Sequence, residues 1–304
     1  MTKTYGSFTA LSNLNLRLEG TKCVGFLGPN GAGKTTTLKI FTDLIRPSSG
    51  QAFIDGIDVQ RHKMAALDRV GTLIETPEIY PAMTPNEALR LVAEVKGVPR
   101  EERSKVIEGA GAEVRMEEWM DKRVGKFSKG MKQRICIAAA LIGDPDILIF
   151  DEPTSGLDPR GMAEVRAIIK QLKNKDRLVF MSSHLLPEVT EVCEEVAMID
   201  RGKLIVFDTI TNVKSKFART VDLADVGFLS GVDEALLARI RSLEGVSMAQ
   251  KTSSDHISIK FEGGKPAQQR LFAQLGAMNV GAVSFSESAS GLEEAYLNLI
   301  QETL

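Results

Sequence analysis

The sequence predicts an α/β fold for most of the chain and a smaller α+β domain towards its C-terminal end. Short, uninterrupted apolar runs at residues 146–150, 178–181 and 196–199 are typical of parallel strands that are buried on both faces of a sheet. Between the first two runs, apolar residues recur at helical spacing over 162–172, which gives the crossover helix that parallel strands require. A glycine-rich loop at 28–33 separates an apolar run from a helical one. These three observations predict the α/β core.

The first elements are expected on either side of the glycine-rich loop. Residues 14–18 alternate between apolar and polar and residues 23–27 run apolar, so we expect two short strands joined by a turn at Glu19-Gly20. The stretch KTTTLKIFTDLI, which begins at Lys34, has helical character and ends before Pro47. The local order is therefore strand, glycine-rich loop, helix.

A helical subdomain is expected to interrupt the sheet at about residues 84–143. Helix-like segments lie at 86–96, 101–110 and 131–142, and the last of them carries an apolar stripe. The core domain with this insertion is expected to span residues 1–210.

Beyond residue 208 the composition changes. The polar, basic stretch TNVKSKFART at 211–220 predicts a short linker. After it we expect elements in the order β-α-β-β-α-β, which is typical of a ferredoxin-like domain, here over residues 220–304. The expected strands are 221–228, 246–250, 257–261 and 282–285, the expected helices are 233–243 and 266–278, and a final helix carries Leu292, Ala295, Tyr296, Leu299 and Ile300 on one face.

Composition excludes several classes of protein. Lys and Arg total 38 against 40 for Asp and Glu, so a formal charge of -2 gives no broad basic surface for nucleic acid. The three cysteines lack metal-ligand spacing and are odd in number, which argues against a disulfide framework and favours a reducing, cytosolic compartment. No stretch approaches the ~20 apolar residues that a membrane-spanning helix needs, and residues 1–10 lack the apolar core of a signal peptide. If a membrane is involved, another chain must span it.

The glycine-rich loop matches the P-loop pattern G-x-x-x-x-G-K-[ST] in full, between a predicted strand and a predicted helix. Glycines let backbone N–H groups wrap phosphates, and the N-terminus of the following helix adds positive potential. Lys34 is expected to reach the β- and γ-phosphates of ATP, and Thr35 to ligate Mg²⁺. The candidate nucleotide-binding residues here are Gly28, Pro29, Asn30, Gly31, Ala32, Gly33, Lys34, Thr35 and Thr36.

Two carboxylates end the apolar run at 146–150. Asp151 is expected to hold the hydration shell of Mg²⁺, and Glu152 to orient and polarise the attacking water. An acidic pair at the end of a strand is more often a loop or a helix cap when it stands alone. Beside a P-loop, the catalytic interpretation is favoured.

Three further elements follow in the order found in ATP-binding cassette (ABC) ATPases, and residues 1–207 resemble that family. The segment FSKGMKQR at 127–134 resembles its signature motif, SGLDP at 155–159 its D-loop, and His184 in SSH its switch histidine. Tyr5 matches the aromatic residue that stacks on adenine in the family, although a lone tyrosine here could equally be a surface residue.

The resemblance implies a head-to-tail dimer of two nucleotide-binding domains. ATP on the P-loop of one chain would face Ser128 and Gly130 of the other, with the D-loop residue Asp158 also at the site. Ser128 and Gly130 open a predicted helix, whose N-terminal amides can bind the γ-phosphate. His184 would contact the γ-phosphate from the P-loop chain; the alternative is a structural histidine.

The sequence departs from the commonest family pattern at two places. In the signature motif, Lys129 stands where glycine is usual and Met131 where glutamine is usual. Glu75 stands where the family has a glutamine that touches Mg²⁺ and couples to the transport subunit. The stretch around Glu75 resembles that of exporters of bacitracin and lantibiotics, where glutamate also occurs. The alternative for Glu75 is a solvated loop carboxylate.

The resemblance implies a cytosolic ATPase subunit of an ABC exporter, similar to drug, antibiotic-peptide or sodium efflux ATPases with an extra C-terminal domain. The chain is expected to be peripheral on the inner face of the cell membrane. Its expected partners are a transmembrane permease and a second ATPase, either another copy or a different ABC chain. The permease is expected to dock near residues 75–85, where Ile79, Tyr80 and Met83 offer apolar contacts. One alternative is a soluble nucleotide switch that acts on nucleic acid or the ribosome, and another is an interaction module without hydrolysis.

Overall fold

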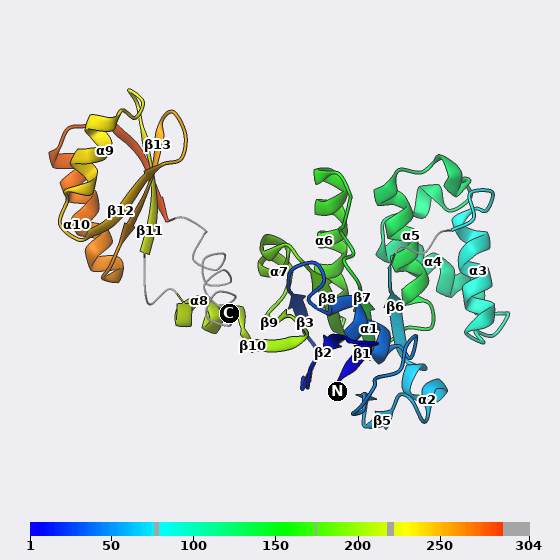
Figure 1. Ribbon diagram of the computed structural model, residues 1–304. Helices are drawn as coiled ribbons and strands as arrows, with labels where there is room; N and C mark the ends of the chain where they lie inside the picture. Colours follow the sequence, from blue (N-terminus) through cyan, green and yellow to red (C-terminus); the bar gives the residue numbers. More distant parts are fainter. Residues whose placement is uncertain (76–78, 174, 218–221, 288–304) are drawn as a thin grey trace. The chain divides into compact units, whose positions relative to one another are not determined.

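The computed structural model describes residues 1–75, 79–173, 175–217 and 222–287 (Figure 1). The chain divides into two compact units, Met1–Ile210 and Thr211–Leu304. No helix of the described residues is long and apolar enough to cross a membrane.

A six-stranded sheet organises the first unit, in the order β10-β9-β3-β8-β7-β6. Its strands are parallel except for β10, which pairs antiparallel with β9. The strands predicted at 23–27, 146–150, 178–181 and 196–199 are confirmed, and so is the α/β class. The strands are β3 Cys23–Leu27, β6 Val70–Leu73, β7 Ile147–Phe150, β8 Leu178–Ser183, β9 Glu195–Asp200 and β10 Lys203–Thr209.

Helices pack against this sheet because their apolar residues recur at helical spacing. In α6, Val165, Ile168 and Leu172 are buried, and the helix contacts β8. In α1, Leu38 and Ile40 join a core that includes the Phe26 and Phe180 rings, whose centroids lie 5.3 Å apart. The helices around the sheet are α1 Lys34–Phe41, α2 Lys63–Leu67, α6 Pro159–Lys173 and α7 Leu186–Val192.

The strand predicted at 14–18 is absent. The side chains of residues 14–18 do alternate in burial, with Leu14 buried and Asn15 exposed. However, these residues form no strand, and the nearby strand β4 Phe53–Ile54 pairs with β5 Ile57–Asp58. The N-terminal strands β1 Lys3–Tyr5 and β2 Phe8–Leu11 pair with each other. The alternation of apolar and polar residues at 14–18 therefore predicted which side chains are buried, but it did not show whether another strand lies beside them to form hydrogen bonds.

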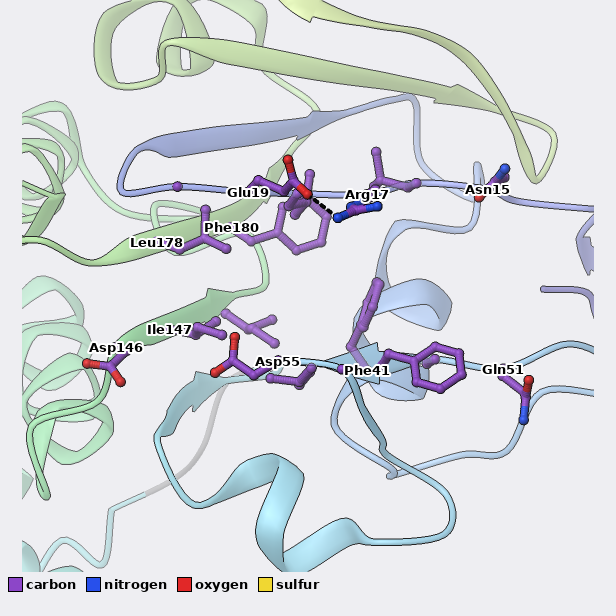
Figure 2. Close-up of a pocket in the computed structure, with 18 of the residues that line it drawn as sticks. Asn15, Arg17, Glu19, Phe41, Gln51, Asp55, Asp146, Ile147, Leu178 and Phe180 are labelled. Carbon is purple, nitrogen blue, oxygen red and sulfur yellow. Dashed lines mark ion pairs between the residues drawn. The ribbon is translucent and has the colours of Figure 1, made fainter.

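A cavity of about 890 Å³ lies between residues 14–21 and 51–56 (Figure 2). Apolar side chains, among them Phe41 and Phe180, line it together with exposed carboxylates such as Asp55. It reaches the first residues of β7 and β8, whereas the P-loop follows the last residue of β3. The cavity and the P-loop thus lie at opposite ends of the parallel strands.

The helical insertion contains α3 Pro85–Val95, α4 Arg103–Glu113 and α5 Lys129–Leu141, which contact one another (Figure 1). These helices match the segments predicted at 86–96, 101–110 and 131–142. Thr84 begins α3 with a capping box, because its hydroxyl accepts from the Glu87 N–H and the Glu87 carboxylate accepts from the Thr84 N–H.

The second unit contains a four-stranded antiparallel sheet in the order β12-β13-β11-β14. Helix α9 packs against β12, and α10 against β11 and β14. Most of the stretch predicted as a linker, 211–220, lies in helix α8 Ile210–Phe217, which buries Ile210 and Val213, and the division between the two units falls at its start. The final helix predicted from Leu292 lies outside the described residues. The other elements are β11 Asp222–Phe228, α9 Glu234–Arg241, β12 Val246–Lys251, β13 His256–Phe261, α10 Gly264–Ala277 and β14 Ala282–Glu287.

Candidate ATP-binding site

The P-loop joins β3 to α1, and two of its glycines are sterically required. A Cβ at Gly28 would lie 2.3 Å from the carbonyl oxygen of Ile199. Gly33 has φ +106° and packs so closely that a Cβ would lie 2.7 Å from the Leu11 side chain. The first turn of α1 carries no acidic residue, which keeps its N-terminus suitable for an anion.

Lys34 is the first residue of α1 and is only 5% exposed. Its Nζ donates to the carbonyl oxygens of Gly28 at 2.7 Å and Pro29 at 3.1 Å, and lies 3.3 Å from Glu152 Oε1. The ammonium group is therefore held over the P-loop by the backbone of the loop itself. Thr35 and Thr36 follow it on α1, both half-buried.

Asp151 and Glu152 follow β7, at the same end of the sheet as the P-loop. Asp151 is buried and its N–H donates to the Leu73 carbonyl of β6 at 2.7 Å. Glu152 has a positive φ of 45°, and its Oε2 lies 3.0 Å from His184 Nδ1. Together with the Lys34 contact, this brings the three residues predicted as catalytic into one chain of contacts.

Ser182 is a residue that sequence reasoning missed. Its hydroxyl contacts both acidic residues, donating to Asp151 Oδ1 at 2.5 Å and accepting from the Glu152 N–H at 2.9 Å. The sequence signal that could have found it is the polar SSH run at the end of an otherwise apolar strand.

Glu75, predicted as a metal ligand, lies two residues beyond β6 and is paired with Lys39 of α1. Its side chain is 64% exposed and its φ is +60°. Leu73, two residues earlier, accepts the Asp151 N–H, so Glu75 lies near the acidic pair in the fold. Among the described residues, however, its ion pair is with Lys39.

A second cluster contains the residues of the signature motif and the D-loop. Ser128 caps α5, and its Oγ accepts from the Met131 N–H at 3.2 Å. Asp158 likewise caps α6 by accepting from Gly161 N–H at 2.8 Å, and a Cβ at Gly130 would lie 3.4 Å from the Cα of Gly161. The Ser155 N–H, at the start of the D-loop, donates to the Glu152 carbonyl at 3.0 Å. Within the described residues, no hydrogen bond or ion pair joins Ser128, Gly130 or Asp158 to the P-loop, Asp151, Glu152 or His184.

Tyr5 is the last residue of β1, and among the described residues it makes no hydrogen bond or ring contact with either cluster. Its side chain is 49% exposed, and the Lys3 ammonium lies 4.9 Å from the centre of its ring. The ring is accessible, as stacking on a base would require.

Comparisons with known proteins match this arrangement. A family model described as "ABC transporter" matches residues 11–155, and one described as "AAA domain, putative AbiEii toxin, Type IV TA system" matches 120–191. The bacitracin transport ATP-binding protein BcrA of Bacillus licheniformis is 41% identical over 207 residues, which are 67% of this chain and 66% of that protein. The linearmycin resistance ATP-binding protein LnrL of Bacillus subtilis is 31% identical over 307 residues, 99% of this chain and 97% of that protein.

Solved structures give the same result for the first unit. The dimeric ATP-binding cassette MJ0796 bound to ADP and Pi, in a post-hydrolysis state, has a TM-score of 0.61 at 26% identity, over 69% of this chain and 96% of that one. Because relatives above 30% identity align with this chain along nearly its whole length, the chain belongs to the ABC transporter ATP-binding proteins, the ATPase subunits of ABC transporters.

Proposed function

We propose that this ATPase powers export through a separate membrane-spanning permease, to which it binds from the cytoplasmic side of the membrane. The observation that carries the proposal is the contact chain Lys34–Glu152–His184 at the P-loop. The names of the relatives support export, because BcrA and LnrL are a bacitracin transport and a linearmycin resistance protein.

Within the proposed site, backbone N–H groups of the P-loop and the N-terminus of α1 hold the phosphates of ATP. Lys34 binds the β- and γ-phosphate oxygens. Glu152 orients the attacking water and accepts its proton, while His184, in contact with Glu152, faces the γ-phosphate. The exposed ring of Tyr5 stacks on the adenine.

Mg²⁺ fits the donors present, because the hydroxyl of Thr35 and the carboxylate of Asp151 are the hard oxygen ligands it prefers. Asp151 Oδ1 accepts from Ser182, and Oδ2 makes no hydrogen bond among the described residues. When bound, Mg²⁺ neutralises charge on the phosphate oxygens. Glu75 is proposed to join this site, which requires it to leave its ion pair with Lys39.

A composite site between two chains is supported by Ser128, Gly130 and Asp158, which make no hydrogen bond to the P-loop, Asp151, Glu152 or His184 among the described residues. Ser128 and Gly130 at the start of α5, with Asp158 before α6, would complete the site on the P-loop of a second ATPase. The N-terminal amides of α5 would then bind the γ-phosphate. A homodimer satisfies this geometry, as does a pair with a different ABC chain.

The second unit is proposed to be a ferredoxin-like accessory domain without a catalytic role. Its order β12-β13-β11-β14, with α9 and α10 following β11 and β13, is the arrangement expected for that fold. We place this domain at residues 220–304 and the nucleotide-binding domain at 1–210.

Permease docking is proposed at residues 79–83, next to Glu75. Tyr80 is 71% exposed, and Ile79 and Met83 are half-buried. Partly and fully exposed apolar side chains beside a proposed metal ligand suit a contact that transmits movement to the ATP site.

The test is affinity purification of the chain from detergent-solubilised membranes of its native host, with identification of bound proteins by mass spectrometry. Wild type is expected to retain an integral membrane protein, and the Tyr80→Ala, Met83→Ala double variant to lose it while still binding ATP. The control is Leu44→Ala, Met64→Ala, which removes two exposed apolar side chains elsewhere on the same unit. Wild type found with ribosomes or nucleic acid and no membrane protein would instead support the soluble switch.

A further inference from the structure

The Ser182 hydroxyl lies between the two acidic residues of the ATP site. Ser182 is the fifth residue of β8 and has no exposed surface. Its Oγ donates to Asp151 Oδ1 at 2.5 Å and accepts from the Glu152 N–H at 2.9 Å. One hydroxyl therefore fixes the side chain of the first acid and the backbone of the second, across the boundary between β7 and β8.

The backbone at Glu152 needs such support. Its φ of +45° is in the left-handed region, where a residue with a Cβ is disfavoured. Asp151 is anchored on one side, since its N–H donates to Leu73 of β6, and Glu152 is anchored on the other by Ser182. The turn after β7 is thus held by both neighbouring strands.

We infer that Ser182 is a positioning residue for ATP hydrolysis. By occupying Asp151 Oδ1, it turns the other carboxylate oxygen towards the proposed Mg²⁺ position; by holding the Glu152 N–H, it keeps that side chain between Lys34 and His184. Hydrogen bonds to charged groups are stronger than those between neutral groups, and this one is shielded from water. The Ser182 hydroxyl can therefore fix the orientation of the Asp151 carboxylate. The inference rests on the roles proposed above for Asp151 and Glu152.

The neighbouring serine performs a different task, which makes it a matched control. Ser183 Oγ donates to Glu188 Oε2 at 2.8 Å and accepts from the Leu185 N–H at 3.0 Å, at the start of α7. It is also buried. Ser183→Ala therefore removes a buried hydroxyl from the same strand, and with it the contact to Glu188, without removing a contact of Asp151 or Glu152.

The first measurement is steady-state ATP hydrolysis by the full chain. Ser182→Ala is expected to lower kcat about 10- to 100-fold, the usual effect of losing a residue that orients a metal ligand. The KM for ATP should change by less than about threefold, because Lys34 and the P-loop amides remain. Ser183→Ala should keep kcat within about threefold of wild type.

A second measurement does not depend on turnover. The affinity for a fluorescent ATP analogue is measured with Mg²⁺ and with EDTA, and the gain in affinity given by Mg²⁺ is compared between variants. Ser182→Ala should reduce this gain about tenfold, and Ser183→Ala should leave it unchanged.

Two further variants separate the hydrogen bonds from the volume of the side chain. Ser182→Thr keeps the hydroxyl but adds a methyl group to a filled site, whereas Ser182→Cys keeps nearly the same volume but is a poor donor. The inference is supported if the threonine variant has a higher kcat than the cysteine variant and a larger gain in nucleotide affinity from Mg²⁺. Greater recovery with cysteine, or a wild-type Mg²⁺ gain in Ser182→Ala, would overturn it while leaving the ATPase function intact. A wild-type protein whose nucleotide affinity ignores Mg²⁺ would contradict the proposed metal site itself, and the inference with it.

Discussion

Glu152 shares its two carboxylate oxygens between Lys34 and His184, so one side chain links the P-loop to the end of β8. Glu75 is a different kind of acid, largely exposed and paired with Lys39. The two carboxylates therefore respond differently to neutralisation. In the proposed function, Glu152 activates water and Glu75 couples the site to the permease.

For Glu152→Gln we expect ATP binding without turnover. Glutamine keeps the shape and hydrogen-bonding reach towards His184, but it cannot accept the proton from water. ATP should then accumulate in a stable dimer, detected by size-exclusion chromatography with radiolabelled nucleotide. Lys34→Ala is the contrasting variant, expected to lose nucleotide binding or turnover. Undiminished hydrolysis by Glu152→Gln would remove Glu152 from its assigned role.

Two variants distinguish the ways in which Glu75 could act. Glu75→Gln and Lys39→Met both remove the ion pair, and each should change stability by less than about 1 kcal/mol because the pair is exposed. If the carboxylate acts on Mg²⁺, Glu75→Gln alone should raise the Mg²⁺ concentration needed for half-maximal turnover. Equal kinetics for both variants and wild type, with and without the permease, would mean that Glu75 is a solvated loop residue.

Arg177 connects the helical insertion to the sheet immediately before β8. Its guanidinium donates to Glu113, the last residue of α4, at 2.9 Å and to Asp144, in the turn after α5, at 2.6 Å. Arg177 is 4% exposed and the Glu113 side chain 20%, so this pair is held largely without water, whereas the Asp144 side chain is 87% exposed. Arg177, which contacts the helical insertion, thus lies just before β8, while Ser182 and His184 lie at its other end.

We expect Arg177→Met to lower the free energy of unfolding by about 3 kcal/mol, because Glu113 loses its buried partner and keeps only the more exposed Lys175, 3.1 Å away. The control is Arg69→Met, which breaks an exposed pair with Asp146 and should cost less than about 1 kcal/mol. Urea unfolding followed by circular dichroism measures both. Equal losses of unfolding free energy for the two variants would show that the Arg177 ion pairs stabilise the protein no more than an exposed pair does.

At the scale of the whole molecule, the residues proposed for the ATP site all belong to the first unit. Every residue that we assign to nucleotide or metal lies at or before His184, and the division between the compact units falls at Ile210. The second unit has its own core around Val226, Ile257 and Ile259. Its influence on catalysis should therefore be indirect.

A chain truncated after Ile210 should keep its ATP affinity, because no proposed ligand is removed. Changes are expected instead in dimerisation or in stimulation by the permease. Isothermal titration calorimetry with an ATP analogue, on a fragment shown to be folded by circular dichroism, checks this. Loss of nucleotide binding by the folded fragment would contradict the independence of the two domains.

Much of the core could be predicted from sequence because its signals are local. Buried parallel strands are continuous apolar runs, and the P-loop pattern is contiguous around Lys34. The strand expected at 14–18 was wrong because pairing depends on a neighbour that alternation does not specify. Helix α8 was missed because its apolar positions, Ile210 and Val213, are few among polar residues.

The contacts within the site were beyond sequence reasoning for the same physical reason. Ser182 meets Asp151 only because β7 and β8 are adjacent in the sheet, although 31 positions separate them in the chain. Likewise, the pair formed by Lys39 and Glu75 depends on how α1 lies relative to the end of β6. Residue types and spacing indicated which side chains are chemically competent, and the fold determines which of them touch.

The two edges of the core sheet discourage aggregation. One edge, β6, is only 4 residues long, and the other, β10, carries a register shift between Leu204 and Val206 against β9. Short or irregular edges are poor templates for adding a strand from another molecule. The core sheet therefore offers two copies of this chain little opportunity to join edge to edge at high concentration.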